Sequence, residues 1–503
     1  MAISIIHIVR NSLKFSLVRA ISAILGLPVT IYVATILVPE EYGIYGFLGL
    51  WLMYAGLIGP GIFSAGQREI PVLLGRDEEA EALTVQNISI SSEMLYTVVP
   101  FVIILGASSF FSEPILKFGL IIVAISYLAS RLVGFWSGIN FIREHFNIVA
   151  KARLIALISP LVIAASVYWL KVYALLIAPV IASVFSVIYY CKKGPINYHF
   201  ALDRTKVVRL LKVGVILQGL TLIFWAFRLT DRTIIAATLP LEQLGLYTYA
   251  MAFLMYALTL PTDFGRVLQP ILWREAGKAS SIFEGFAGTA RIAVYMALGL
   301  SVLIPIAQLV YYLVMNLITI RYAGSIPIFY VLSYNLYLAS IVIIPNLVLR
   351  SSIVNRQNIT LCLYAIGLAL NIAFDLLVIK LGYGVVGVAW VTVCVQALVT
   401  LILYRFIKGY ISKDMKEFLR FQARILFPFL IVVPFYFFHN YLNLTTSSIW
   451  TFVGISLAAQ VVLWSLVISI FYRDYISISD IKAVIKEVNT VIGDRLRFKK
   501  VVK

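Results

Sequence analysis

Apolar runs of about 20 residues recur from one end of this chain to the other. A helix of that length crosses the roughly 30 Å hydrocarbon core of a bilayer. The chain is 61% hydrophobic and 13% charged, whereas soluble domains are about 45–50% apolar and about 25% charged. The sequence therefore predicts an all-α polytopic membrane protein.

The pattern of apolar runs predicts about fourteen transmembrane helices. Twelve of them form the main body, at 13–37, 43–64, 89–111, 115–138, 153–170, 173–191, 211–229, 243–265, 291–317, 325–349, 359–379 and 384–405. Two more follow at 423–441 and 449–471. The longest connection on the predicted inner side, 191–212, is basic and separates the first six helices from the next six.

A stretch of the first half returns in the second half. Segment 43–55 reads GIYGFLGLWLMYA and segment 245–257 reads GLYTYAMAFLMYA, with six identical positions at a constant offset of 202. Gln67 and Gln269 keep the same offset. Such self-similarity indicates homologous halves. Because an even number of helices separates the copies, they run the same way through the membrane, as a parallel repeat.

These observations divide the chain into four parts. We expect an N-lobe of six helices at 1–191, a C-lobe with its basic linker at 192–412, and two additional helices at 413–472. The remaining tail, 473–503, is basic and has apolar residues mostly at helical spacing. It lies either on the anionic inner leaflet or in solvent as the end of a protein with positive inner loops.

The lysines and arginines are distributed unevenly between the two predicted sides. If the N-terminus is cytoplasmic, the inner segments carry 33 of the 41, and cytoplasmic loops of membrane proteins are enriched in these residues. We therefore place both termini in the cytoplasm and the protein in the cell (inner or plasma) membrane. The net charge of +18 then reflects inner loops and not a nucleic-acid partner. The first apolar run is long enough to span and has no small-residue cleavage site after it, so we expect a retained helix.

Motifs for catalysis or metal binding are missing from the sequence. No G-x-x-x-x-G-K-[ST] loop occurs, the four histidines are scattered, and the three cysteines lack paired or metal-type spacing. We expect no catalytic residue, no metal site and no cofactor other than H+ or Na+ coupling or the membrane potential. A membrane glycosyltransferase or polymerase would need carboxylates converging on a sizeable loop, and we find none.

Four arginines lie within predicted helices or at their ends: Arg19, Arg131, Arg228 and Arg232. Ionisable side chains at membrane depth are costly and point to function. Guanidinium groups match phosphate oxygens bidentately and keep their charge when buried. The set predicts a cavity for an anionic headgroup such as phosphate or pyrophosphate. Alternatively, the first two extend to the inner interface and the last two only pair with Asp231.

The candidates for ion coupling are three carboxylates: Asp231, Asp375 and Glu93. Asp231 shares a helix face with Arg228 and Arg232 and can pair with either. Glu93 is expected at the start of the third helix. Asp375 is either a protonation or cation site or the partner of Lys380, and the sequence favours the partner. Three amides, Gln218, Asn371 and Gln396, are expected to form interhelical hydrogen bonds and not substrate contacts.

Several short motifs resemble the Wzx-type O-antigen and polysaccharide flippases of the MOP exporter superfamily. The resemblance covers nearly the whole chain and rests on the order of motifs, the repeat and the helix count. Its motifs are LVPEEYGIY at 37–45, Asp231-Arg232, LGLY at 244–247, Ala250 and Gln269-Pro270.

That resemblance implies two six-helix lobes that open alternately inward and outward. The implied activity is translocation of a polyprenyl-(pyro)phosphate-linked oligosaccharide to the outer leaflet. The implied partners are membrane lipids and other polysaccharide-assembly membrane proteins. In the related lipid II flippases the two extra helices help form a groove for the lipid tail. The alternative within the superfamily is an ion-coupled antiporter of the MATE type, whose cation sites are acidic residues of the first half, whereas the first helix here carries Arg19.

Overall fold

The computed structural model describes residues 25–471, except 76, 144, 195–196, 279–280, 352, 413 and 446–447. In this part of the chain all regular structure is helical, with no strand. Arg19 and the tail 473–503 lie outside the described residues. The prediction of an all-α, multi-pass membrane protein is confirmed.

The first half opens with a short apolar helix, Leu25–Ile36. The elements that follow are α2 (Pro39–Leu57), α3 (Ile62–Gly75), α4 (Glu79–Ala107), the short 3-10 helix η1 (Ser108–Phe110), α5 (Pro114–Ile142), α6 (Phe146–Ile155), α7 (Ile158–Leu170) and α8 (Val172–Lys193).

The second half begins with two long helices and ends with a separate pair. Its elements are α9 (Arg204–Thr238), α10 (Leu241–Lys278), α11 (Ile282–Ala287), α12 (Thr289–Leu317), η2 (Ile320–Ser325), α13 (Ile326–Leu332), α14 (Tyr334–Ile341), α15 (Ile343–Arg350), α16 (Gln357–Lys380), α17 (Gly384–Phe406) and α18 (Lys408–Ile411). The pair is α19 (Met415–Thr445) and α20 (Ile449–Phe471).

Ten helices of the described residues are long and apolar enough to cross a membrane, or eleven if α2 and α3 form one bent span. The spans expected at 211–229 and 243–265 lie inside α9 and α10, which are 35 and 38 residues long. Helix covers most of the described residues in each of the fourteen expected spans. The tenth expected span is divided among α13, α14 and α15.

The expected span 43–64 is broken. α2 ends at Leu57, α3 begins at Ile62, and their axes differ by 55°. Pro60 has no backbone N–H to donate, and Gly61 adopts a φ of +69°, so the sequence Ile58-Gly-Pro-Gly cannot continue an α-helix. The carboxamide of Gln218 on α9 donates to the carbonyl of Leu57 and so satisfies one group at the break. The interhelical hydrogen bond expected for this glutamine is present.

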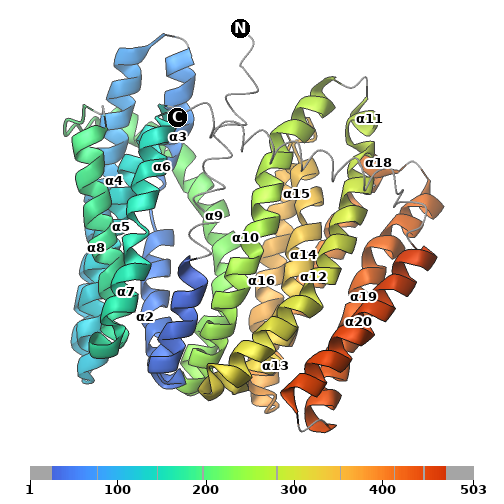
Figure 1. Ribbon diagram of the computed structural model, residues 1–503. Coiled ribbons are helices and arrows are strands. Elements are labelled where there is room, and N and C mark those ends of the chain that lie inside the picture. Colours follow the sequence, from blue (N-terminus) through green and yellow to red (C-terminus); the bar gives the residue numbers. More distant parts are fainter. Residues whose placement is uncertain are drawn as a thin grey trace, which may run out of the picture.

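The helices form two bundles, with α2 and α9 running between them (Figure 1). One bundle contains α4 to α8 and the other contains α10 and α12 to α17. The two copies of the sequence repeat meet here, because α2 packs along α10. The final pair, α19 and α20, packs on α12 at the edge of the second bundle.

Helix α9 contacts both bundles. Near its start Arg209 pairs with Glu69 of α3 at 2.6 Å, and Lys206 pairs with Glu81 of α4 at 2.7 Å. Further along, α9 packs against α16. One end of the helix is therefore attached to the first bundle while its other end carries side chains into the second bundle.

Candidate functional site

A cluster of polar side chains surrounds Asp231 where α9, α10, α16 and α17 meet. Its carboxylate accepts hydrogen bonds from Tyr247, from Thr392 Oγ1 at 2.7 Å and from Asn371 Nδ2 at 2.9 Å. The same Asn371 amide nitrogen also donates to Asp375 Oδ2 at 2.8 Å. Asn371 and Asp375 have no exposed surface and Asp231 is 4% exposed. Two carboxylates are thus held close together within the second bundle.

Two oxygens of this cluster have no hydrogen-bond donor. Asn371 Oδ1 and Asp375 Oδ1 are buried and unpartnered. Leaving a buried polar atom unpartnered costs about 1–3 kcal/mol, and such atoms call for an explanation such as an ion. The two carboxylates, the amide oxygen and the Thr392 hydroxyl together offer oxygen ligands, which hard cations prefer.

The structure changes two expectations about these carboxylates. Asp375 bonds to Asn371 and not to Lys380, which is exposed at the end of α16, so the favoured pairing with that lysine is wrong. Asn371 forms the interhelical hydrogen bond expected of it. The spacing of Asn371 and Asp375, four residues apart, places both on one helix face. Sequence reasoning missed Tyr247 and Thr392, although Tyr247 lies in the repeated stretch.

Arg232 points away from its neighbour Asp231. Its Nη2 atom lies 3.7 Å from the sulfur of Met53 on α2, while its Nε atom is buried without a partner. No ion pair joins Asp231 to Arg232 in the described part of the chain, so the alternative in which these two residues pair is wrong, whereas pairing of Asp231 with Arg228 stays a prediction. Arg228 lies one turn earlier on α9, and its side chain is not among those described. Arg232 therefore presents a cation toward the first half of the chain.

The first bundle contains an ion pair at membrane depth. Arg131 Nη2 on α5 lies 2.7 Å from Glu93 Oε1 on α4, and the guanidinium sits over the ring of Phe135. Glu93 was expected at a helix start, but α4 begins at Glu79, so the carboxylate lies near the middle of that helix. Its side chain is 4% exposed, whereas that of Arg131 is 25% exposed. Arg131 is thus the accessible member of a pair that the sequence did not connect.

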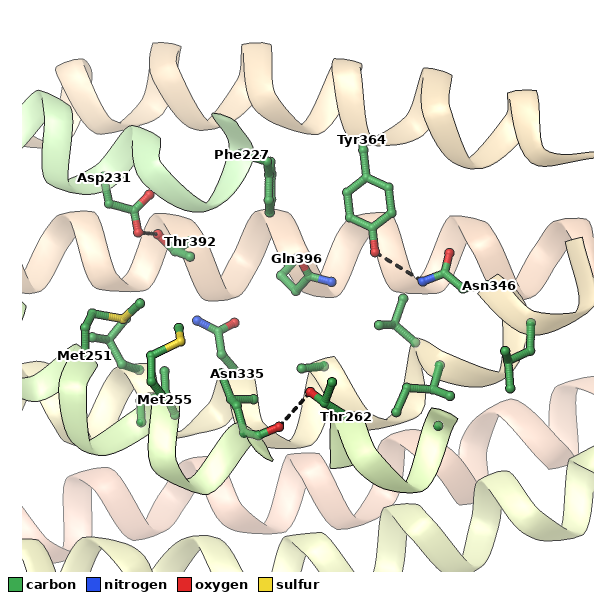
Figure 2. Close-up of a pocket in the computed structure, with 18 of the residues that line it drawn as sticks. Phe227, Asp231, Met251, Met255, Thr262, Asn335, Asn346, Tyr364, Thr392 and Gln396 are labelled. Atoms are coloured by element: carbon green, nitrogen blue, oxygen red, sulfur yellow. Dashed lines mark hydrogen bonds between the residues drawn. The ribbon is translucent and has the colours of Figure 1, made fainter. Parts of the chain in front are cut away.

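A cavity of about 300 Å³ lies inside the second bundle (Figure 2). Asp231 and Thr392 lie at one end, Tyr364 and Asn346 lie at the other, and Asn335 and Gln396 project between them. Gln396 was expected to bond between helices, but it lines this cavity. A second cavity, also of about 300 Å³, shares Asn346, Arg350 and Tyr364 with the first.

An apolar groove of about 240 Å³ lies between α19 and the α14–α17 pair. Its walls are almost entirely hydrocarbon, and two polar side chains, Thr400 and Gln422, contribute to the lining.

Among the described residues no group of three or more His, Cys, Asp or Glu side chains could hold a metal ion.

Comparison with solved structures identifies the fold. The lipid II flippase MurJ in an inward closed conformation aligns with a TM-score of 0.64 and 17% identity, over 92% of this chain and 99% of that chain. An inward-facing multidrug resistance MATE family transporter of the MOP superfamily aligns with a TM-score of 0.62 and 14% identity, over 82% of this chain and 98% of that chain. A MOP superfamily transporter from Pyrococcus furiosus aligns with a TM-score of 0.55 and 15% identity, over 83% of this chain and 96% of that chain.

No curated protein matches the chain by sequence. A family model described as polysaccharide biosynthesis protein matches residues 32–302, which is more than half of the chain. The family and the fold agree with the resemblance seen in the sequence motifs, and the similar structures are of transporters and flippases. The protein has a flippase or transporter fold of the MOP type, and the chain belongs to the polysaccharide biosynthesis protein family.

Proposed function

We propose that the protein is a flippase that moves polyprenyl-(pyro)phosphate-linked oligosaccharide from the cytoplasmic to the outer leaflet by alternating access, for surface polysaccharide or O-antigen assembly. The observation that carries the proposal is a cationic side chain in each half, on α5 and on α9. Arg131 is the accessible member of its pair in the first bundle, and Arg232 of the second half faces Met53 on α2. In a member of this family, these cations suit an anionic headgroup.

The headgroup contacts are assigned to arginines because a diphosphate stays charged throughout its passage. Arg131 and Arg232 each keep a buried Nε–H without a partner, which is a donor that a phosphate oxygen can accept from. Arg19 and Arg228 remain part of the proposed set on sequence grounds alone. A charged sugar headgroup crosses between the halves while its lipid tail stays in the bilayer.

The lipid tail is assigned to the groove beside α19. Its lining of leucine, isoleucine and phenylalanine side chains suits a prenyl chain, because burial of hydrocarbon contributes about 25 cal/mol per Å². In this assignment α19 of the additional pair contacts the lipid tail, which is the role that the resemblance to lipid II flippases implies for the two extra helices.

The cluster around Asp231 is assigned to the coupling ion. The unpartnered oxygens of Asn371 and Asp375 fit a monovalent cation, and Na+ matches an all-oxygen set. A proton on one of the two adjacent carboxyls is the alternative, which a test with separate Na+ and pH gradients distinguishes. Glu93, the third sequence candidate, is paired with Arg131 and is assigned to positioning that arginine.

Transport in this direction also agrees with the membrane potential. Moving net negative charge outward is favoured by an inside-negative potential, by about 2.3 kcal/mol per charge per 100 mV. We place the protein in the inner or plasma membrane with both termini in the cytoplasm, because the predicted inner segments hold most of the lysines and arginines.

The test is a flipping assay in proteoliposomes with a fluorescent polyprenyl-diphosphate oligosaccharide. Wild type is compared with Arg232→Ala and with the control Arg321→Ala, which changes an exposed arginine of η2. We expect wild type and the control to flip the lipid and Arg232→Ala to lose at least tenfold in rate while remaining folded. A folded wild type that stays inactive under Na+, pH and potential gradients would overturn the proposal, and uptake of a small cationic dye instead would favour an antiporter.

A further inference from the structure

We propose that the cavity inside the second bundle binds sugar residues of the transported glycan, separately from the arginines that hold the phosphate. The proposal rests on the flippase function. The substrate then has two binding regions. The arginines bind the phosphate, which all polyprenyl phosphates share, and the cavity binds the sugar residues and selects among glycans.

Four carboxamides face this cavity: Gln269 of α10, Asn335 of α14, Asn346 of α15 and Gln396 of α17. No hydrogen bond joins the amide of Asn335 or of Gln396 to another described residue. Asn346 donates to the Tyr364 hydroxyl at 3.4 Å, which leaves its buried Oδ1 unpartnered. A carboxamide donates two hydrogen bonds and accepts others, and a sugar hydroxyl likewise donates and accepts. The spare donors and acceptors therefore match a polyhydroxylated ligand.

Apolar side chains supply the remaining walls. Phe227 and Tyr364 present aromatic rings, and Met251 and Met255 line the opposite side (Figure 2). Pockets of this kind orient a ligand with a few polar groups on a largely apolar and aromatic surface. A sugar has such mixed character, because its ring carbons form apolar faces between the hydroxyls. Methionine adapts its shape to irregular ligands, which suits a glycan with several linkage geometries.

The charges of the cavity exclude a phosphate from its interior. Arg350 is its one cationic residue among the lining side chains, and it lies exposed at the end of α15. At the opposite end, the Asp231 carboxyl group already accepts three hydrogen bonds. A phosphate placed between Asn335 and Gln396 would be desolvated without a cationic side chain beside it, and burial of an unpaired charge is costly. Neutral sugar hydroxyls meet no such penalty.

The available volume also suits a glycan. The first cavity and the second, which begins at Asn346, Arg350 and Tyr364, have about 300 Å³ each. Thr360, which lines the second cavity, has a buried hydroxyl oxygen without a partner. More than one sugar can thus be bound between Arg350 and the centre of the bundle.

The geometry also connects the sugar to the coupling ion. Asp231 and Thr392 belong to the ion cluster and line the same cavity (Figure 2). A sugar hydroxyl bound to Thr392 would change the hydrogen bond that this residue donates to Asp231. The ion site and the sugar site therefore share Asp231 and Thr392. Binding of the ion then changes the affinity of the protein for the sugar, and binding of the sugar changes its affinity for the ion by the same factor.

The test measures protection of a cysteine in the cavity. Ala339→Cys is made in full-length protein with Cys191, Cys362 and Cys394 replaced by serine, and labelling by a small thiol reagent is timed. Three probes are compared: the host's own lipid-linked oligosaccharide, the free oligosaccharide released from it, and polyprenyl diphosphate without sugar. Gly409→Cys on α18, where a side chain meets nothing within 4 Å, controls for reagent reactivity.

We expect both sugar-bearing probes to slow labelling of Ala339→Cys at least fivefold and polyprenyl diphosphate to leave it unchanged. Adding Asn335→Leu or Gln396→Met should remove the protection, whereas Asn316→Leu, whose amide bonds to the Tyr312 carbonyl, should keep it. Equal protection by polyprenyl diphosphate would overturn the proposal, as would no protection by any probe while wild type flips the lipid. Protection by free oligosaccharide requires binding but no transport. The labelling result can therefore be interpreted even if the flipping assay fails.

Discussion

Gly43 and Gly245, which are equivalent positions of the sequence repeat, contact each other across the junction of the two halves. A Cβ atom added to Gly43 would lie 1.8 Å from the carbonyl oxygen of Leu241, and one added to Gly245 would lie 1.7 Å from that of Pro39. The contact is reciprocal, so each copy of the repeat accepts the backbone of the other. Both positions need glycine, because α2 and α10 cross so closely that any side chain there would meet the backbone of the other helix.

Adding a side chain at this crossing should separate the two helices. We expect Gly245→Ala to lower the free energy of unfolding by about 1–3 kcal/mol, as overpacking of a tight core does, and to reduce flipping more than tenfold. Thermal unfolding in detergent and the proteoliposome assay measure the two effects. Gly49→Ala is the matched control, because it lies on α2 with nothing within 4 Å of its Cβ. If both variants behaved like wild type, the close crossing would have no role in transport.

The helices and the repeat are predictable from the sequence because each follows from a local pattern. The length of the apolar runs locates the membrane-spanning helices. Identical residues at a constant offset show that α2 and α10 are equivalent helices of the two halves. The break at 58–61 also has a local signal, since Gly59, Pro60 and Gly61 follow one another. Apolar length alone conceals it, because a broken span is as hydrophobic as a continuous one.

The site is less predictable because its contacts join helices that are far apart in the chain. Sequence spacing allowed Asp231 to pair with an arginine on its own helix. In the fold, Asp231 turns toward Asn371 and Thr392, which are 140 and 161 positions away. Similarly, Arg131 and Glu93 are recognisable as costly charges at membrane depth, but nothing local indicates that they are partners.

Replacing the carboxyl group of Asp375 should uncouple transport from the ion gradient. We expect wild-type flipping to increase with an inward Na+ gradient and Asp375→Asn to lose that increase, because one oxygen ligand becomes neutral or is replaced by a nitrogen. Initial flipping rates with Na+ or K+ outside, at equal pH, measure the effect. Glu113→Gln, at an exposed carboxylate before α5, should keep the dependence. A response to pH and not to Na+ in wild type would identify the coupling ion as H+.

The orientation of the chain can be tested from both sides with single cysteines. In protein lacking its three native cysteines, Ser112→Cys before α5 should react in intact cells with a thiol reagent that cannot cross the membrane. Gly409→Cys on α18 should react only after permeabilisation, because the basic connection beside it is expected on the cytoplasmic side. The reverse pattern would place the termini outside and overturn the predicted direction of transport.

Variants of Arg131 and Glu93 should distinguish a structural role of the arginine from a role in transport. Removing one member of a buried pair costs up to about 3–5 kcal/mol, and Arg131 is partly exposed, so we expect Arg131→Ala to cost less, about 1–3 kcal/mol. Arg131→Ala with Glu93→Gln should recover most of that stability, because no unpaired carboxylate remains. Flipping should stay low in both variants if the guanidinium binds the headgroup. A double variant that regains both stability and flipping would show that Arg131 serves only to neutralise Glu93.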